Sequence, residues 1–200
     1  MERARLQYVE RICLLGAPGS GKSTLALVLA QALNLPLIRM SDLQQQMAAA
    51  LGEHAAVGAR VAYMERMLAS QPWITDGYYQ LSVDLRLRKA DLVIFLDLPL
   101  HVCLRSVLKR GWNNLLGLHT TAYQSYRASL AARISYAFGP RIYKRVFEFQ
   151  YRRRPALLEK LQALGQPEKV VTFQSRAAVN ALISQISSAQ TDTGRSGVSL

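Results

Sequence analysis

Nine consecutive residues near the N-terminus combine glycine, lysine and hydroxyl side chains in a pattern suited to phosphate binding. They are Gly16, Ala17, Pro18, Gly19, Ser20, Gly21, Lys22, Ser23 and Thr24, and they match G-x-x-x-x-G-K-[ST] in full. Glycine lets the backbone wrap closely, so successive N–H groups can point inward, and the following helix adds partial positive charge. Lys22 can reach the β- and γ-phosphates, and the Ser23 hydroxyl can hold Mg²⁺. The segment therefore predicts a site for ATP and Mg²⁺.

A second acidic group is expected to help organise the Mg²⁺ through bound water, because this ion keeps several of its waters. Two aspartates each end a hydrophobic run, Asp76 in WITDGY and Asp97 in VIFLDLP. The aspartate that serves the Mg²⁺ should be the one whose strand lies beside the strand leading into residues 16–24. Sequence spacing alone does not say which strand that is.

The elements that must position these groups alternate along the chain. Apolar runs predict strands at residues 9–15, 37–40, 72–75, 92–96 and 169–173. Helical patterns occupy residues 22–33, 41–69 with a break near Gly52 or Gly58, 83–90, 101–110, 122–137, 141–164 and 177–186, with a break at 111–117. Ser41 and Asp42 are expected to cap the second of these helices. Nearly continuous apolar strands between helices indicate an α/β fold, a parallel sheet covered on both faces, with its ligand site at the carboxyl edge.

Composition limits the class of protein further. The chain has 200 residues, half of them hydrophobic, and a formal net charge of +12, which fits one globular domain and excludes wholesale disorder. We expect a domain over residues 1–187, with basic helices at about 111–165, and a flexible tail at 188–200. No run of about 20 apolar residues predicts a membrane span. Two separate cysteines in apolar runs favour a cytoplasmic protein without disulfides, and the three histidines have no zinc-ligand spacing.

The basic excess is concentrated between residues 105 and 160, where Glu148 and Glu159 are the only acids. Such a segment attracts polyanions, either nucleic acid or the phosphates of a small ligand. A solvated helical face is the alternative interpretation.

Four motifs together resemble the adenylate-kinase-related P-loop kinases known as DNA topology modulation proteins. They are residues 16–24, WITDGY at 73–78, DLRLRKAD at 84–91, and LVIFLDLP at 92–99 followed by LKR at 108–110. More distantly, the chain resembles nucleoside monophosphate kinases and shikimate kinase. The resemblance implies a three-layer α/β/α P-loop NTPase fold, five parallel strands in the order 2-3-1-4-5, and a basic helical lid. It makes Asp76 the preferred Mg²⁺ partner and leaves Asp97 to cap the helix that carries the lid.

The same resemblance implies roles for several further residues. Arg110, Arg153 and Arg154 would close over the phosphates, and Asp42 would be either a general base or a plain helix cap. The arginine that follows Asp-Gly in nucleoside monophosphate kinases is absent here, and Arg39, Arg86 and Arg88 are candidate substitutes.

Three functions follow as hypotheses. The first is a kinase that transfers the γ-phosphate of Mg-ATP to a small-molecule acceptor. The second is a nucleic-acid-binding ATPase or DNA topology modulator that uses the basic region. The third is a nucleotide-binding protein without catalysis.

Overall fold

The five strands form one parallel sheet whose order confirms the expected topology. The computed structural model describes residues 9–69, 72–116 and 139–195. Its strands are β1 (Arg11–Gly16), β2 (Leu37–Arg39), β3 (Trp73–Asp76), β4 (Leu92–Leu96) and β5 (Val170–Phe173), in the order β2-β3-β1-β4-β5. β1 lies between β3 and β4, with Leu14 opposite both Asp76 and Ile94. The residues that follow β1, β3 and β4 therefore meet at one edge of the sheet.

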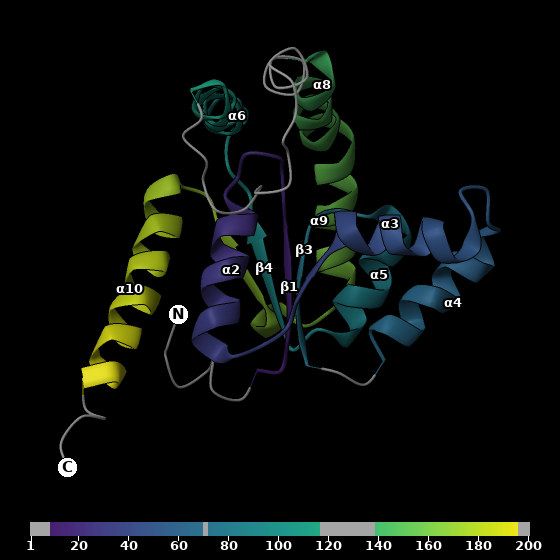
Figure 1. Ribbon diagram of the computed structural model, residues 1–200, viewed down its shortest axis with the longest axis horizontal. Helices are drawn as coiled ribbons and strands as arrows, with labels where there is room; N and C mark the ends of the chain where they lie inside the picture. The colour runs from purple at the N-terminus through teal and green to yellow at the C-terminus, as the bar shows by residue number, and fades with distance from the viewer. Residues whose placement is uncertain (1–8, 70–71, 117–138, 196–200) are drawn as a thin grey trace.

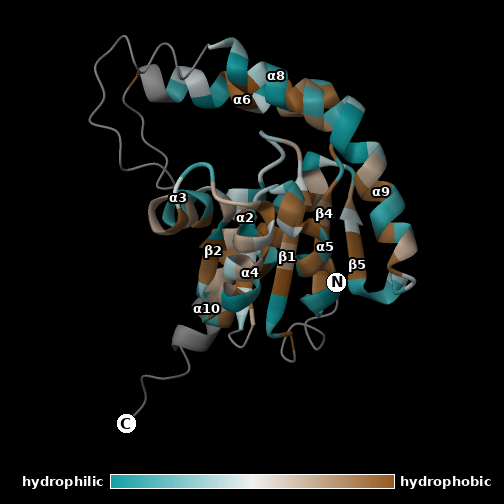
Figure 2. Ribbon diagram, turned by 90° about the vertical axis from the view of Figure 1, so that its right-hand side faces the viewer, coloured by the Kyte–Doolittle hydropathy of each residue, from teal (hydrophilic) through white to brown (hydrophobic). Residues whose placement is uncertain are grey.

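Helices cover both faces of this sheet, giving the three-layer α/β/α arrangement (Figure 1). α2 (Lys22–Leu33) and α10 (Arg176–Arg195) cover one face, and α3 (Met40–Leu51), α4 (Val57–Met67) and α5 (Gln80–Lys89) lie on the other. α6 (Leu100–Leu115) and α8 (Pro140–Glu148) extend across the carboxyl edge (Figure 2). A π-helical turn, η1 (Phe149–Arg153), joins α8 to α9 (Arg154–Ala163), and a 3₁₀ turn, η2 (Pro167–Lys169), precedes β5.

The alternation of side chains in β1 divides the core into two parts. Ile12 and Leu14 pack with apolar residues of α2 and α10, whereas Cys13 and Leu15 belong to the cluster on the opposite face. All four are fully buried. Successive side chains of a strand point to opposite faces, so a strand covered on both sides must be apolar throughout. Packing on both faces of β1 holds its end, Gly16, where the glycine-rich segment of residues 16–24 begins.

Two helices, α6 and α10, extend beyond the ends predicted for them. Gly52 ends α3 as expected, but α6 continues through Gly111 to Leu115, where a break was predicted. Gly111 is buried, and a helix interior tolerates glycine where close packing favours it. α10 extends beyond Ile186 to Arg195, so part of the expected tail is helical. The helix predicted at 122–137 lies outside the described residues.

Asp97 at the end of β4 forms an ion pair instead of capping α6, which corrects that expectation. Arg154 Nε and Nη2 donate to the two carboxylate oxygens of Asp97 at 2.5 and 2.7 Å. The amides of Val102 and Cys103 donate to the carbonyl oxygen of Pro99. The bidentate pair fastens the start of α9 to the carboxyl edge of the sheet. No helix in the described part of the chain is long and apolar enough to cross a membrane.

A double-mutant cycle on this pair measures how firmly α9 is fastened. The Asp97 side chain is 7% exposed and that of Arg154 is 33% exposed, so solvent screens the pair only in part. We expect Asp97→Asn and Arg154→Met each to lower the free energy of unfolding, with a coupling energy of about 1–2 kcal/mol. Urea unfolding of the four proteins gives this value. Additive effects of the two substitutions would contradict the pairing.

Candidate functional site

The phosphate loop, residues 16–24, has a backbone shape that its glycines make possible. Gly16, Gly19 and Gly21 have φ angles of +144°, +82° and +96°. A Cβ at Gly16 would lie 2.6 Å from the carbonyl oxygen of Leu96, and one at Gly19 would collide with that of Cys103 in α6. The loop is therefore pressed against both β4 and α6, and only glycine allows this approach.

Lys22 at the start of α2 points back into the loop. Its ammonium Nζ donates to the carbonyl oxygen of Ala17 at 2.6 Å and to Ser20 Oγ at 3.4 Å. Burial lowers the pKa of Lys22, an effect that nearby Asp76 opposes and nearby Arg110 reinforces. A cation is thus held out of water against one carbonyl and one hydroxyl group of the loop, which suits an anion site.

Asp76 ends β3, which pairs directly with β1, and it lies close enough to Lys22 to affect the pKa of the ammonium group. It is 6% exposed, and its Oδ1 has no hydrogen-bond partner among the described residues. Ser23 is exposed in the first turn of α2. No group of three or more His, Cys, Asp or Glu side chains in the described residues could hold a metal ion. A buried unpartnered carboxylate oxygen beside a hydroxyl-bearing loop fits Mg²⁺, which keeps most of its waters and needs few protein ligands.

The residues after β2 differ from the expectation for Ser41 and Asp42. α3 begins at Met40, and its N-cap is Arg39, which makes no side-chain capping bond. Asp42 is exposed in the first turn, where its Oδ1 accepts a hydrogen bond from Ser41 Oγ. The helix starts early because Met40 is buried against Gly77, so Asp42 is not the cap.

The three arginines predicted to close over the phosphates occupy different places. Arg110 lies close enough to Lys22 to lower the pKa of its ammonium group. Arg153 lies over the Tyr78 ring, with its guanidinium carbon 5.1 Å from the ring centroid, and its Nη2 is 3.5 Å from Glu148 Oε2. Arg154 is engaged by Asp97, as described above. Their roles toward a nucleotide stay predictions.

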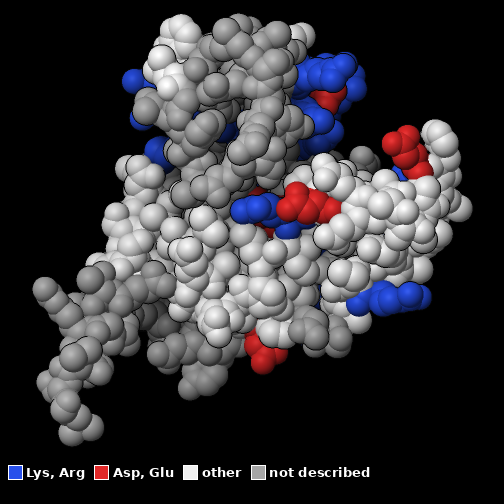
Figure 3. All heavy atoms as spheres, in the orientation of Figure 1, with Lys and Arg blue, Asp and Glu red and all other residues white. Residues whose placement is uncertain are grey.

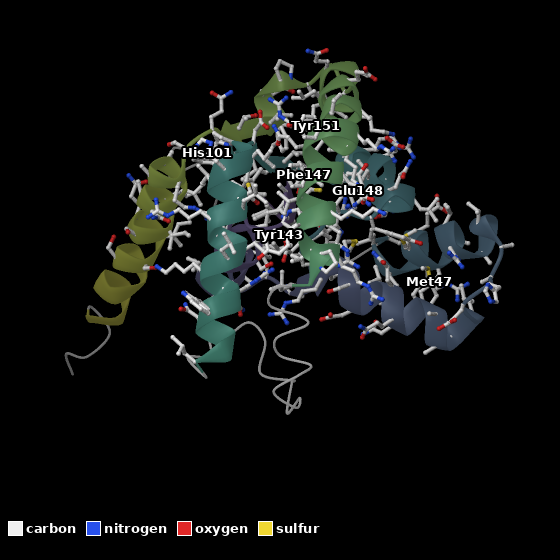
Figure 4. The ribbon with its side chains drawn as sticks, turned by 90° about the horizontal axis from the view of Figure 1, so that it is seen from above. Met47, His101, Tyr143, Phe147, Glu148 and Tyr151 are labelled. Carbon is white, nitrogen blue, oxygen red and sulfur yellow. The ribbon has the colours of Figure 1, made fainter. Side chains whose placement is uncertain are left out.

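A cavity of about 650 Å³ lies between α6 and α10, next to the phosphate loop. Its lining includes residues of both helices, namely His101, Val102, Arg105, Ser106, Lys109, Arg110, Asn113, Arg176 and Asn180. Figure 4, which views the molecule from above, shows His101 on the side of α6 that faces α10. The volume is in the range of pockets that take a small organic ligand.

Two further arginines contact the site: Arg86, which the sequence offers as a candidate substitute for the missing arginine, and Arg176, which sequence reasoning did not select. Arg86 is fully buried and donates from Nη1 to the carbonyl oxygen of Gly77 at 2.9 Å; its Nε and Nη2 have no partner among the residues described. Arg88, another candidate substitute for the missing arginine, is exposed.

Arg176 follows β5 and contacts the phosphate loop. The rule that residues after parallel strands meet at one edge applies to β5 as well and could have identified Arg176.

Comparisons with known proteins agree with the fold. The family model described as "ATPase family associated with various cellular activities (AAA)" matches residues 12–97, from β1 to the end of β4. No curated protein matches the sequence. Among solved structures, the shikimate kinase from Acinetobacter baumannii in complex with shikimate has a TM-score of 0.53 at 14% identity, covering 95% of this chain and 97% of that one. At this identity the likeness concerns the fold, and the chain has the α/β fold of P-loop NTPases.

Proposed function

We propose that this protein is a kinase that binds Mg-ATP on the phosphate loop and transfers the γ-phosphate to a small-molecule acceptor. The observation that carries the proposal is the buried ammonium group of Lys22 inside the glycine loop. The buried carboxylate of Asp76 is close enough to oppose part of the lowering of the Lys22 pKa. A buried cation and a nearby buried acid that could bind a metal ion suit a triphosphate and its Mg²⁺.

Each residue of the site would have a separate role in phosphoryl transfer. Loop amides and Lys22 would bind the β- and γ-phosphates, and Arg110 would add positive charge where it develops. Mg²⁺, held by Ser23 and through water by Asp76, would supply neutralising charge between the phosphates. The cavity between α6 and α10 would receive the rest of the nucleotide.

The acceptor is assigned to the side of the loop formed by α3 and the residues after β3. A pocket of about 180 Å³ lies there, lined by residues of α3, α4 and their connection together with Tyr79. Met47 of α3 is among them (Figure 4). Arg39, opposite Asp76 in the sheet register, and exposed Asp42 are near the start of α3, where Asp42 is our candidate general base.

A phosphotransfer screen with γ-labelled ATP tests the proposal. The panel comprises nucleosides, nucleoside monophosphates, sugars, hydroxy acids such as shikimate, and aminoglycosides. We expect label on one acceptor class for the wild type, and a loss of at least about 10³-fold for Lys22→Met, because the variant lacks the cation that contacts the transferred group. ATP binding without turnover across the panel would favour a non-catalytic nucleotide-binding protein.

The same Lys22→Met variant is expected to be more stable than the wild type without nucleotide. Burial depresses the folded-state pKa of Lys22 below its ordinary value of 10.5, so the folded state disfavours the charged form. We expect a gain of about 1 kcal/mol at pH 7. Because the wild type loses this penalty as pH rises from the folded pKa to the unfolded one, the difference should shrink at high pH. Urea unfolding at several pH values measures it, and a less stable variant at pH 7 would contradict this account.

Nucleic-acid binding is a second candidate function, favoured by one feature of α8 and η1. Phe147 and Tyr151 stack at 6.3 Å between centroids with planes 7° apart, although 43% and 68% of their surfaces are exposed. The same segment exposes four basic residues, Arg141, Lys144, Arg145 and Arg152. Figure 3 shows a blue cluster around one acidic group where Figure 1 places α8. Aromatic rings among basic side chains suit stacking with the bases of a single strand.

Fluorescence anisotropy with labelled single-stranded DNA tests this candidate. We expect affinity to fall steeply with salt, with a log–log slope of about −0.7 for each phosphate contacted. Phe147→Ala with Tyr151→Ala should weaken binding by roughly 10-fold or more through lost stacking, whereas Arg66→Ala, an exposed change on α4, should not. Binding that does not respond to salt would rule the candidate out.

A further inference from the structure

Arg176, the first residue of α10, places its guanidinium against the outer side of the phosphate loop. Its Nη1 donates to the carbonyl oxygen of Ser20 at 2.9 Å, and its Nη2 donates to that of Gly19 at 2.5 Å. Nη2 also donates to Ser106 Oγ of α6 at 2.7 Å. One side chain thus joins three segments that are far apart in the sequence: the loop, α6 and the start of α10.

The two carbonyl groups that Arg176 holds determine where the loop amides point. In a trans peptide the C=O of one residue and the N–H of the next lie in one plane and point in opposite directions. Holding the Gly19 and Ser20 carbonyls toward Arg176 therefore directs the N–H groups of Ser20 and Gly21 away from it. The Ser20 N–H bonds to the Ala17 carbonyl oxygen at 3.1 Å, which closes the loop on itself.

Position 21 requires glycine because of its backbone conformation, and Arg176 lies against the space that a side chain there would take. A Cβ built at Gly21 would lie 2.5 Å from Arg176 Nη1, and the backbone there has a φ of +96°. The guanidinium therefore lies directly against the backbone of the loop at Gly21.

We infer that Arg176 is a positioning residue that fixes the phosphate-binding shape of the loop from its outer side and links it to α6. The inference rests on the proposed binding of a triphosphate to this loop. Because a guanidinium is planar and donates in parallel, it can bridge two successive carbonyls, which a lysine ammonium at the same place cannot do in the same geometry.

A direct contact with the nucleotide is the competing role, since Arg176 also lines the cavity between α6 and α10. The two roles give different results for Arg176→Lys. A group acting mainly as a positive charge keeps its effect in lysine, whereas a group acting through two fixed hydrogen bonds loses it.

The test compares the wild type, Arg176→Lys, Arg176→Ala and Arg66→Ala, an arginine exposed on α4, in two measurements. Calorimetry with Mg-ATP and with inorganic tripolyphosphate should show roughly 10- to 100-fold weaker binding for both Arg176 variants, and less than about twofold for Arg66→Ala. Amide hydrogen exchange without ligand should be faster in residues 19–24 of both Arg176 variants, while strands β1 and β4 keep their protection.

Distinct outcomes would overturn this inference or the proposed function. Wild-type affinity in Arg176→Lys would show that charge alone suffices, and unchanged exchange in the loop of both variants would show that no positioning occurs. Either result overturns the inference, as does a wild type that binds neither Mg-ATP nor tripolyphosphate. Normal triphosphate binding with no phosphotransfer would instead remove the kinase and leave the role of Arg176 standing.

Discussion

A lysine ammonium kept out of water inside a glycine loop is the interaction on which the rest of this site depends. Burial makes the charged form of Lys22 costly, and the Ala17 carbonyl, Ser20 hydroxyl and Asp76 carboxylate offset that cost only in part, because its pKa remains lowered. An incoming polyphosphate would provide the charge that the unliganded protein lacks. A group that is unfavourable for stability and favourable for ligand binding is typical of a functional site.

The sheet order brings the partners of this lysine together. Because β1 is central and buried from Ile12 onward, the loop after it leaves the sheet between the ends of β3 and β4. One neighbour supplies Asp76, and the other supplies Asp97, which engages Arg154. The two aspartates occupy similar positions on either side of β1, yet one has an unpartnered oxygen and the other is in an ion pair. This difference in pairing supports Asp76, not Asp97, as the acid available to a metal ion.

The local elements and the phosphate loop could be predicted from the sequence, because strand hydrophobicity and the glycine pattern are local signals. The sheet order needed the resemblance to known kinases, since spacing does not say which strands are neighbours. The individual contacts of Arg154, Arg153 and Arg176 could not be predicted, because each joins groups more than 50 positions apart in the sequence. Only the place of Arg176 at the carboxyl edge follows from its position after β5. Asp42 shows the limit at short range: the burial of Met40 started the helix early and removed the expected cap.

The arginines around the site also show why a basic composition does not identify a partner. Arg86 is buried beneath Gly77, Arg154 is paired, Arg176 holds the loop, and those of α8 are exposed. The most direct test of the central claim is an ¹H–¹⁵N NMR titration with Mg-ATP. The account predicts that the amides of residues 19–24 shift first and most strongly. Shifts confined to α8 and η1, with a silent loop, would contradict it.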